Sequence, residues 1–142
     1  MIDTRDDAKT LITGLKVSHQ MLIEAISQIQ LCLRSYAQTK PKLRDFYNVL
    51  LNHFSCQDHK FYDRLALHYV DDRQSTKMLE FIIHDFKDLK VRYLVFYDLH
   101  SAEMTGGHPR SFPIDFTEFS THVLGRIKVE EDYLFPLLEK LP

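Results

Sequence analysis

The sequence contains no tryptophan, only two cysteines, four glycines and five prolines among its 142 residues. The cysteines, Cys32 and Cys56, form no Cys-x-x-Cys pair and match no zinc-site spacing. We therefore expect reduced thiols in the core of a cytoplasmic protein. Between the few glycines and prolines, apolar residues recur at helical spacing. This scarcity of chain breaks predicts a small number of long helices.

Long apolar runs and a strong charge of either sign are also lacking. No apolar run reaches the roughly 18 residues of a membrane span. The acidic start, residues 1–7, has no apolar segment typical of a signal peptide. A formal net charge of -2 at pH 7 leaves no basic surface for direct nucleic-acid binding. With 44% hydrophobic and 27% charged residues, we expect residues 1–142 to form a single globular domain.

Apolar residues at alternating three- and four-residue steps mark four stretches of the chain. The short connections between these stretches are typical of an all-α, antiparallel up-down-up-down four-helix bundle. We expect Lys40-Pro41 to separate the first two helices and Pro136 to kink the last one. The four helices are predicted over residues 6–36, 42–69, 76–102 and 115–141.

Five polar residues occupy positions on these apolar stripes where leucine or isoleucine is expected. They are His19, His53, Gln57, Arg126 and Glu130. Burial of such groups is costly unless they pair with one another or bind a ligand. One interpretation is a core polar layer that satisfies itself, with Arg126 paired to Glu130 one helical turn away. The other interpretation is a metal site.

The metal-site interpretation comes from a resemblance to hemerythrin-like domains. That family has one histidine on each of helices one and three, and a His-x-x-x-Glu motif on each of helices two and four. The resemblance implies two non-haem iron ions and the binding or sensing of oxygen or nitric oxide. The metal ligands would then be His19, His53, His84, His122 and Glu130.

Two positions depart from this motif. Gln57 is a neutral amide where the second helix should carry a carboxylate. Arg126 stands four residues before Glu130, where an imidazole is expected, and a protonated guanidinium cannot donate to a metal. His122 lies one turn further back and would require a shifted site.

A second resemblance accommodates Arg126. The segment Asp115–Leu134 is similar to the C-terminal signature of the regulator of sigma D (Rsd/AlgQ) family, in which Arg-x-x-x-Glu-Asp follows an aspartate and alternating apolar residues. Asp45-Phe46, Leu50–Ser55 and Tyr62–Arg64 resemble that family's second helix. The chain departs from the family at Thr13-Gly14-Leu15, where the family has Asp-Arg-Trp, and at Asn52, where it has an acidic residue.

This second resemblance implies an anti-sigma factor that binds the C-terminal promoter-recognition domain of the primary sigma factor. Under this interpretation, which we favour from the sequence, the polar residues form a core layer and the protein binds no metal or cofactor. No phosphate loop, nucleophile elbow or catalytic triad is present, so we expect no enzymatic activity. The expected partner-binding residues are Asp45, Tyr47, Asn52, Phe54, Asp58, Tyr62, Asp63 and Arg64.

Overall fold

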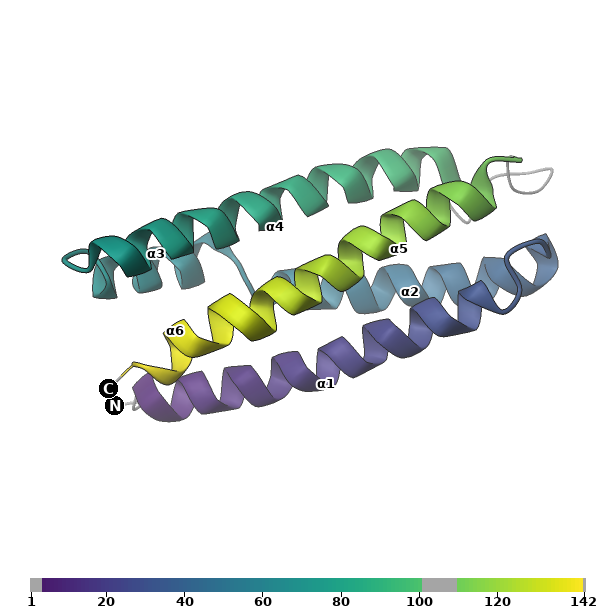
Figure 1. The fold of residues 1–142 in the computed structure, drawn as a ribbon. Coiled ribbons are helices and arrows are strands. Elements are labelled where there is room, and N and C mark those ends of the chain that lie inside the picture. Colours follow the sequence, from purple (N-terminus) through teal and green to yellow (C-terminus); the bar gives the residue numbers. More distant parts are fainter. Residues whose placement is uncertain (1–3, 101–109, 142) are drawn as a thin grey trace.

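The computed structural model describes residues 4–100 and 110–141, and within these ranges it is helical and contains no strand. Figure 1 shows long helical arms lying side by side, with both ends of the chain at the same end of the molecule. The prediction of a helical bundle is confirmed. Its elements are α1 (Thr4–Gln30), α2 (Tyr36–Ser55), α3 (His59–His68), α4 (Arg73–His100), α5 (Phe112–Val129), the π-helical segment η1 (Glu130–Leu134) and α6 (Phe135–Glu139).

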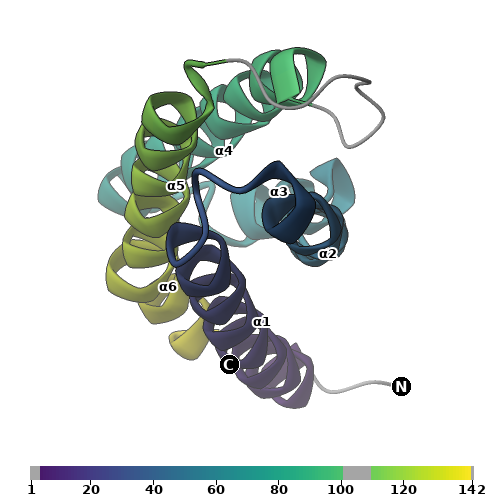
Figure 2. The same ribbon diagram turned by 90° about the vertical axis from the view of Figure 1, so that its right-hand side faces the viewer.

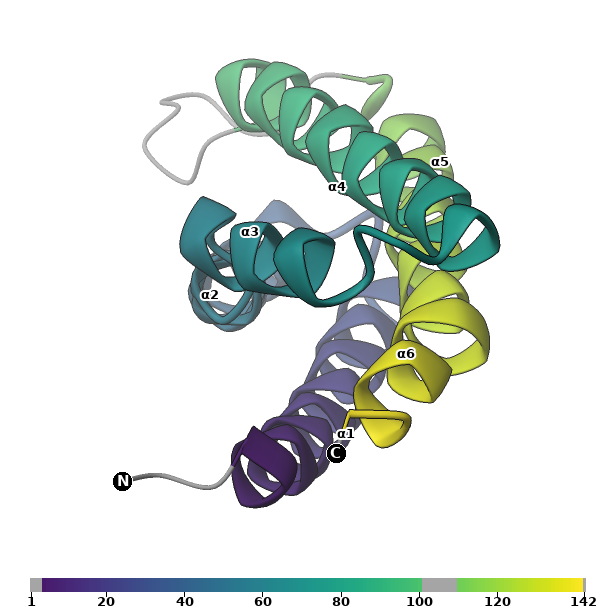
Figure 3. The ribbon, with the colours of Figure 1, turned by 90° about the vertical axis from the view of Figure 1, so that its left-hand side faces the viewer.

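The arms are arranged around a common apolar centre. In Figures 2 and 3, which view the molecule from its two ends, α5 and α6 lie between α4 and α1, and α2 and α3 complete the arrangement. Phe46 from α2 and Phe116 from α5 are fully buried, and their rings meet edge to face at 5.8 Å between centroids. Burial of each such side chain contributes about 1.5–3 kcal/mol. The apolar stripes read from the sequence therefore form the core.

The predicted second helix, residues 42–69, is interrupted in the structure. The backbone of Asp58 is extended, and its Oδ1 accepts a hydrogen bond from the Phe61 N–H at 2.9 Å, so that Asp58 caps a new helix, α3. Side-chain capping outweighs the continuing apolar periodicity at this point. The interruption leaves Gln57 fully buried between the two helices.

The expected break at Lys40-Pro41 is wrong. Helix α2 begins earlier, where Ser35 accepts a hydrogen bond from the Gln38 N–H, and Pro41 lies inside the helix. Pro41 is exposed, and the hydrogen bond that it removes faces water rather than the core.

The last predicted helix contains one wide turn in place of a simple kink. The N–H of Phe135 donates to the carbonyl of Glu130, five residues earlier, in the π-helical segment η1. Pro136 follows immediately and has no N–H to offer the carbonyl of Asp132. Single π-helical turns of this kind are frequent at functional sites, and this one begins at a fully buried glutamate.

The structure also corrects one prediction about the cysteines. Both are free thiols, and Cys32 is buried as expected, but Cys56 is exposed at the end of α2. In the ranges that the structure describes, no helix is both long enough and apolar enough to cross a membrane.

The cap of α3 can be tested by substitution. Because Asp58→Ala removes the acceptor for the Phe61 N–H, we expect the free energy of unfolding to fall by about 1 kcal/mol. Asp63→Ala, on the exposed face of the same helix, is the matched control and should change stability by less than about 0.5 kcal/mol. Urea denaturation followed by circular dichroism measures both. Equal effects of the two substitutions would show that the cap does not define the start of α3.

Candidate metal centre

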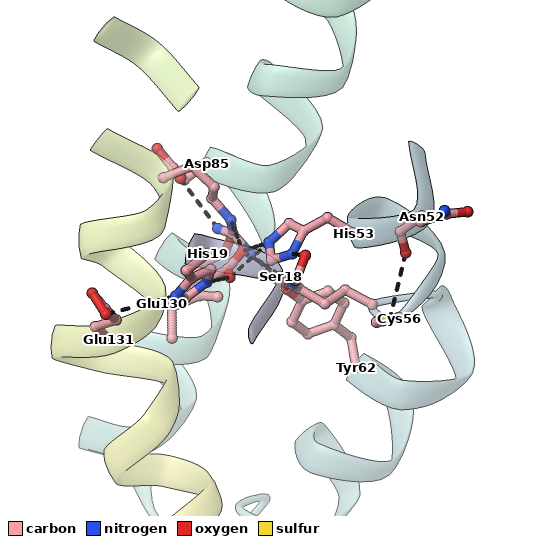
Figure 4. Close-up of polar contacts among 12 residues, drawn as sticks. Ser18, His19, Asn52, His53, Cys56, Tyr62, Asp85, Glu130 and Glu131 are labelled. Atoms are coloured by element: carbon pink, nitrogen blue, oxygen red, sulfur yellow. Dashed lines mark hydrogen bonds and ion pairs between the residues drawn. The ribbon is translucent and has the colours of Figure 1, made fainter. Parts of the chain in front are cut away.

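The five polar residues of the apolar stripes meet in the middle of the bundle. We call this group the polar layer, and each of its members is at most 2% exposed. Figure 4 shows His53 and Glu130 approaching one another from opposite sides of the bundle. The layer draws on α1, α2, the α2–α3 junction, α5 and η1. Its members are His19, His53, Gln57, Arg126 and Glu130.

The carboxylate of Glu130 is the centre of the layer, and its two oxygens face different partners. Oε1 lies 2.7 Å from Nε2 of His19 and 2.9 Å from Nε2 of His53. Oε2 accepts hydrogen bonds from Nε2 of Gln57 and Nε of Arg126, each at 2.8 Å. Nε2 of His53 also lies 3.2 Å from Oε2. Oε1 therefore contacts the two imidazoles, whereas Oε2 contacts the guanidinium, the amide and, at a longer distance, the imidazole of His53.

Arg126 is fully engaged by the surrounding protein. Besides its bond to Glu130, Nη1 donates to the carbonyl of Ile82 at 2.7 Å and to the carboxylate of Asp85 at 3.1 Å. Nη2 donates to Gln57 Oε1 and to the Tyr62 hydroxyl, each at 2.7 Å. These contacts occupy all five N–H donors of the guanidinium, which also lies 5.0 Å from the centre of the Phe86 ring.

The far sides of the two imidazoles differ in their surroundings. Nδ1 of His53 lies 2.7 Å from the hydroxyl of Ser18. Nδ1 of His19 has no hydrogen-bond partner, and the nearest carboxylate oxygen, on Glu131, is 3.6 Å away. Phe135 stacks on the ring of His19 at 5.7 Å between centroids. Both imidazoles are thus fixed with Nε2 toward Glu130 and Nδ1 away from it.

The electrostatics of the layer keep Glu130 ionised. Burial raises the pKa of its carboxyl, but hydrogen bonds from His19 and His53 and the positive charge of Arg126 outweigh burial and hold the pKa well below its usual range. Burial also raises the pKa of Tyr62 far above its ordinary value, although Arg126 opposes the shift. The layer therefore contains an ionised carboxylate and a guanidinium, and the adjacent Tyr62 is a neutral phenol.

Three atoms of the layer are placed to ligate one metal ion. One ligand atom each from His19, His53 and Glu130 lies within 4.8 Å of the others. Tetrahedral Zn²⁺ holds imidazole nitrogen and carboxylate oxygen at about 2.0–2.2 Å, which places ligand atoms roughly 3.3–3.6 Å apart. The 2.7 and 2.9 Å separations from Glu130 Oε1 are hydrogen-bond lengths, so the side chains would have to move apart by about 0.5 Å to hold an ion. When Nε2 binds metal, each imidazole carries its proton on Nδ1. Nδ1 of His53 can donate to the Ser18 hydroxyl, 2.7 Å away, whereas among the described residues Nδ1 of His19 has no acceptor within hydrogen-bond distance.

Comparison with known families agrees with this geometry. Residues 10–138 match the family model described as the hemerythrin HHE cation binding domain. The chain belongs to the hemerythrin family. A search of curated proteins and one of solved structures found no match.

Membership of the hemerythrin family corrects the favoured prediction from the sequence. The expectation of no metal or cofactor is wrong, because a cation-binding family model covers most of the chain and the buried histidines and glutamate form a ligand cluster. The resemblance to the regulator of sigma D family receives no support from the comparisons.

Two residues of the predicted hemerythrin-like ligand set lie elsewhere. His84 is exposed on α4, and His122 is half-buried and lines a groove on the outer side of α4 and α5. The structure brings together only His19, His53 and Glu130 of the five predicted ligands.

The predicted partner-binding residues divide into two groups. Tyr47, Phe54 and Tyr62 are buried, at 5%, 8% and 5% exposure, and cannot serve as surface anchors in this fold. Tyr47 donates to the carbonyl of His100, and Tyr62 belongs to the surroundings of Arg126. The remaining residues are exposed: Asp45, Asn52, Asp58, Asp63 and Arg64.

Sequence reasoning missed three residues around the layer. Ser18 and Glu131 are sequence neighbours of His19 and Glu130, and Asp85 comes from the facing helix α4. No spacing rule distinguishes them from other polar residues on the flanks of a helix. Their roles depend on how the helices pack against one another.

The depressed pKa of Glu130 predicts a pH dependence of stability in metal-free protein. As the pH falls toward 4.5, the ordinary pKa of a glutamate, the Glu130 carboxylate takes up a proton in the unfolded chain but stays ionised in the folded chain. Its stabilising effect is therefore complete above that pH and is lost as the pH falls. We expect the free energy of unfolding to decline more steeply between about pH 6 and pH 3 in the natural chain than in Glu130→Gln.

Urea denaturation in the presence of a chelator measures both slopes. Glu130→Gln keeps the shape of the side chain but cannot ionise, so its lower overall stability does not affect the comparison of slopes. Parallel pH profiles for the two chains would contradict an ionised Glu130 in the folded state.

Proposed function

We propose that the protein binds a divalent transition-metal ion in the core of its bundle, through Nε2 of His19, Nε2 of His53 and the carboxylate of Glu130. The observation that carries the proposal is the convergence of these three buried ligand atoms from three separate elements. A cluster of this kind, inside a chain of a cation-binding family, is the strongest chemical feature of the described residues.

The donor set limits the choice of ion. Two imidazole nitrogens and one carboxylate oxygen suit iron(II) and zinc, whereas magnesium and calcium prefer oxygen ligands throughout. Such a set leaves coordination positions open on the ion. A small ligand could bind the ion at those open positions. We propose that this ligand is oxygen or nitric oxide.

The surrounding residues support the ligands in distinct ways. Arg126 and Gln57 hold Oε2 of Glu130, which leaves Oε1 facing the two imidazoles. The Ser18 hydroxyl can accept the Nδ1 proton of His53 and thereby orient its Nε2 toward the ion. Pre-positioned ligands of this kind favour binding because little ordering remains to be done.

Burial of the layer restricts what can reach the ion. One groove, of about 790 Å³, is lined by residues of α1, α3, α6 and the end of α2, and another groove lies between α4 and α5. None of the five polar-layer residues lines either groove. This arrangement favours a ligand of very few atoms over a substrate-sized molecule.

Other expectations stay predictions. These are the alternating up-down course of the arms, the absence of enzymatic activity, the cytoplasmic location and the primary sigma factor as a partner. The shared position of the two chain ends in Figure 1 supports the alternating course.

Substitution of the ligands tests metal binding directly. Loss of even an outer partner of a metal ligand costs about 10–100-fold in affinity. We therefore expect His19→Ala, His53→Ala and Glu130→Gln each to weaken zinc binding by more than ~100-fold. Competition with a chromophoric chelator gives the affinities, and anaerobic loading with iron(II) followed by elemental analysis repeats the comparison for iron.

The matched controls are His84→Ala and His122→Ala, which remove imidazoles outside the layer. Both should bind zinc like the natural chain. The proposal is wrong if the natural chain binds no zinc or iron(II), or if the controls lose as much affinity as the ligand variants.

A further inference from the structure

The side of Glu130 away from the imidazoles is already occupied by a fixed cation. Nε of Arg126 donates to Oε2 at 2.8 Å, and Gln57 donates to the same oxygen. A carboxylate that bridges two metal ions uses one oxygen for each. In this chain Oε1 is shared by the two histidines. Oε2 accepts from a guanidinium and an amide, and Nε2 of His53 lies 3.2 Å from it.

The guanidinium has no freedom to leave this place. All five of its N–H groups have acceptors, on residues from α3, α4 and η1 and on Gln57, and its flat face lies over the Phe86 ring. Arginine also stays protonated at any pH at which the protein is folded. The positive charge beside Oε2 is therefore permanent.

The groups near Oε2 are poor ligands for a second ion. Gln57 Oε1 already accepts hydrogen bonds from Arg126 and Tyr62. Tyr62 is a neutral phenol, and Asp85 is paired with Arg126. Both buried imidazoles of the layer make their shorter contacts with Oε1, at 2.7 and 2.9 Å, and Nε2 of His53 lies 3.2 Å from Oε2. A second divalent ion would meet a guanidinium there and few free lone pairs.

Charge balance leads to the same conclusion. The carboxylates in or beside the layer are Glu130, Asp85 and Glu131, which carry three negative charges. Arg126 and one divalent ion carry three positive charges between them. With one ion this set of charges is neutral, and with two ions it would carry two uncompensated positive charges. Glu130 is fully buried, whereas Asp85 and Glu131 are 33% and 45% exposed.

We infer that Arg126 takes the place of a second metal ion, so that the polar layer binds one divalent ion per chain. The inference rests on the proposed metal binding and extends it to stoichiometry. The same guanidinium satisfies Glu130 and Gln57 in the metal-free chain, so the layer stays paired when the ion is removed. Arg126 is thus a positioning residue that excludes the second ion and keeps the site assembled.

The test is the number of ions per chain. The 142-residue chain is loaded with excess zinc chloride, dialysed against a weak chelator to remove surface-bound ions, and analysed for zinc and for protein. We expect one zinc per chain. Two zinc ions per chain in the natural protein would overturn the inference while leaving the proposed function intact. A result of zero would overturn both, so the two failures are distinguishable.

A pair of variants tests the role of Arg126 itself. Gln57→Glu supplies a second carboxylate but keeps the guanidinium, and should still bind one zinc. The double variant Gln57→Glu with Arg126→His replaces the cation with an imidazole, and should bind two. Two ions in the single variant, or one ion in a double variant whose circular dichroism shows a folded bundle, would overturn the assignment to Arg126. If the double variant does not fold, the number of zinc ions bound by Gln57→Glu alone still tests the role of Arg126.

Discussion

The central constraint on this protein is an ionised carboxylate with no exposure to water. Glu130 can remain charged in the core only because its two oxygens receive four close partners from different parts of the chain. That requirement aligns α1, α2 and η1 at one level of the bundle. Gln57, at the break between α2 and α3 that Asp58 caps, supplies one of the contacts to Oε2.

Arg126 extends the same constraint to α4. Its bonds to the Ile82 carbonyl and to Asp85 attach the layer to the helix on the opposite side of the core. A buried arginine with unsatisfied donors would destabilise the fold, whereas a fully bonded one fixes the register of three helices at once. The metal ligands are therefore held by contacts that do not involve a metal.

Sequence reasoning recovered much of this arrangement because its main features are periodic. The apolar stripes predicted the helices, and the polar exceptions on those stripes identified all five members of the layer. The break at Asp58 and the wide turn at Glu130 were not predicted, because local capping and a proline one turn downstream outweigh the periodicity there. Cys56 was misplaced for the same reason, since it lies at the interrupted end of α2.

The function was harder to predict because one pair of residues fits two patterns. Arg126 four residues before Glu130 resembles a sigma-regulator signature, and it also resembles a hemerythrin-like motif with one ligand replaced. The family-model match decides between the two. The fold agrees with it, because Nε2 atoms of two histidines from neighbouring helices approach one oxygen of Glu130. The position of Tyr62 was likewise not predictable from the sequence, because its contact with Arg126 depends on the turn that separates α2 from α3.

The wide turn of η1 has a consequence for how the site is encoded. One additional residue in a helical turn rotates everything after it by about 100°. That rotation places Phe135 over the ring of His19, while Glu130 at the start of the turn still points inward. Removal of a single residue from 131–134 would leave every ligand present in the sequence and yet turn Phe135, Leu137 and Leu138 away from their places. The site is thus specified by the length of this segment as well as by the identity of its residues.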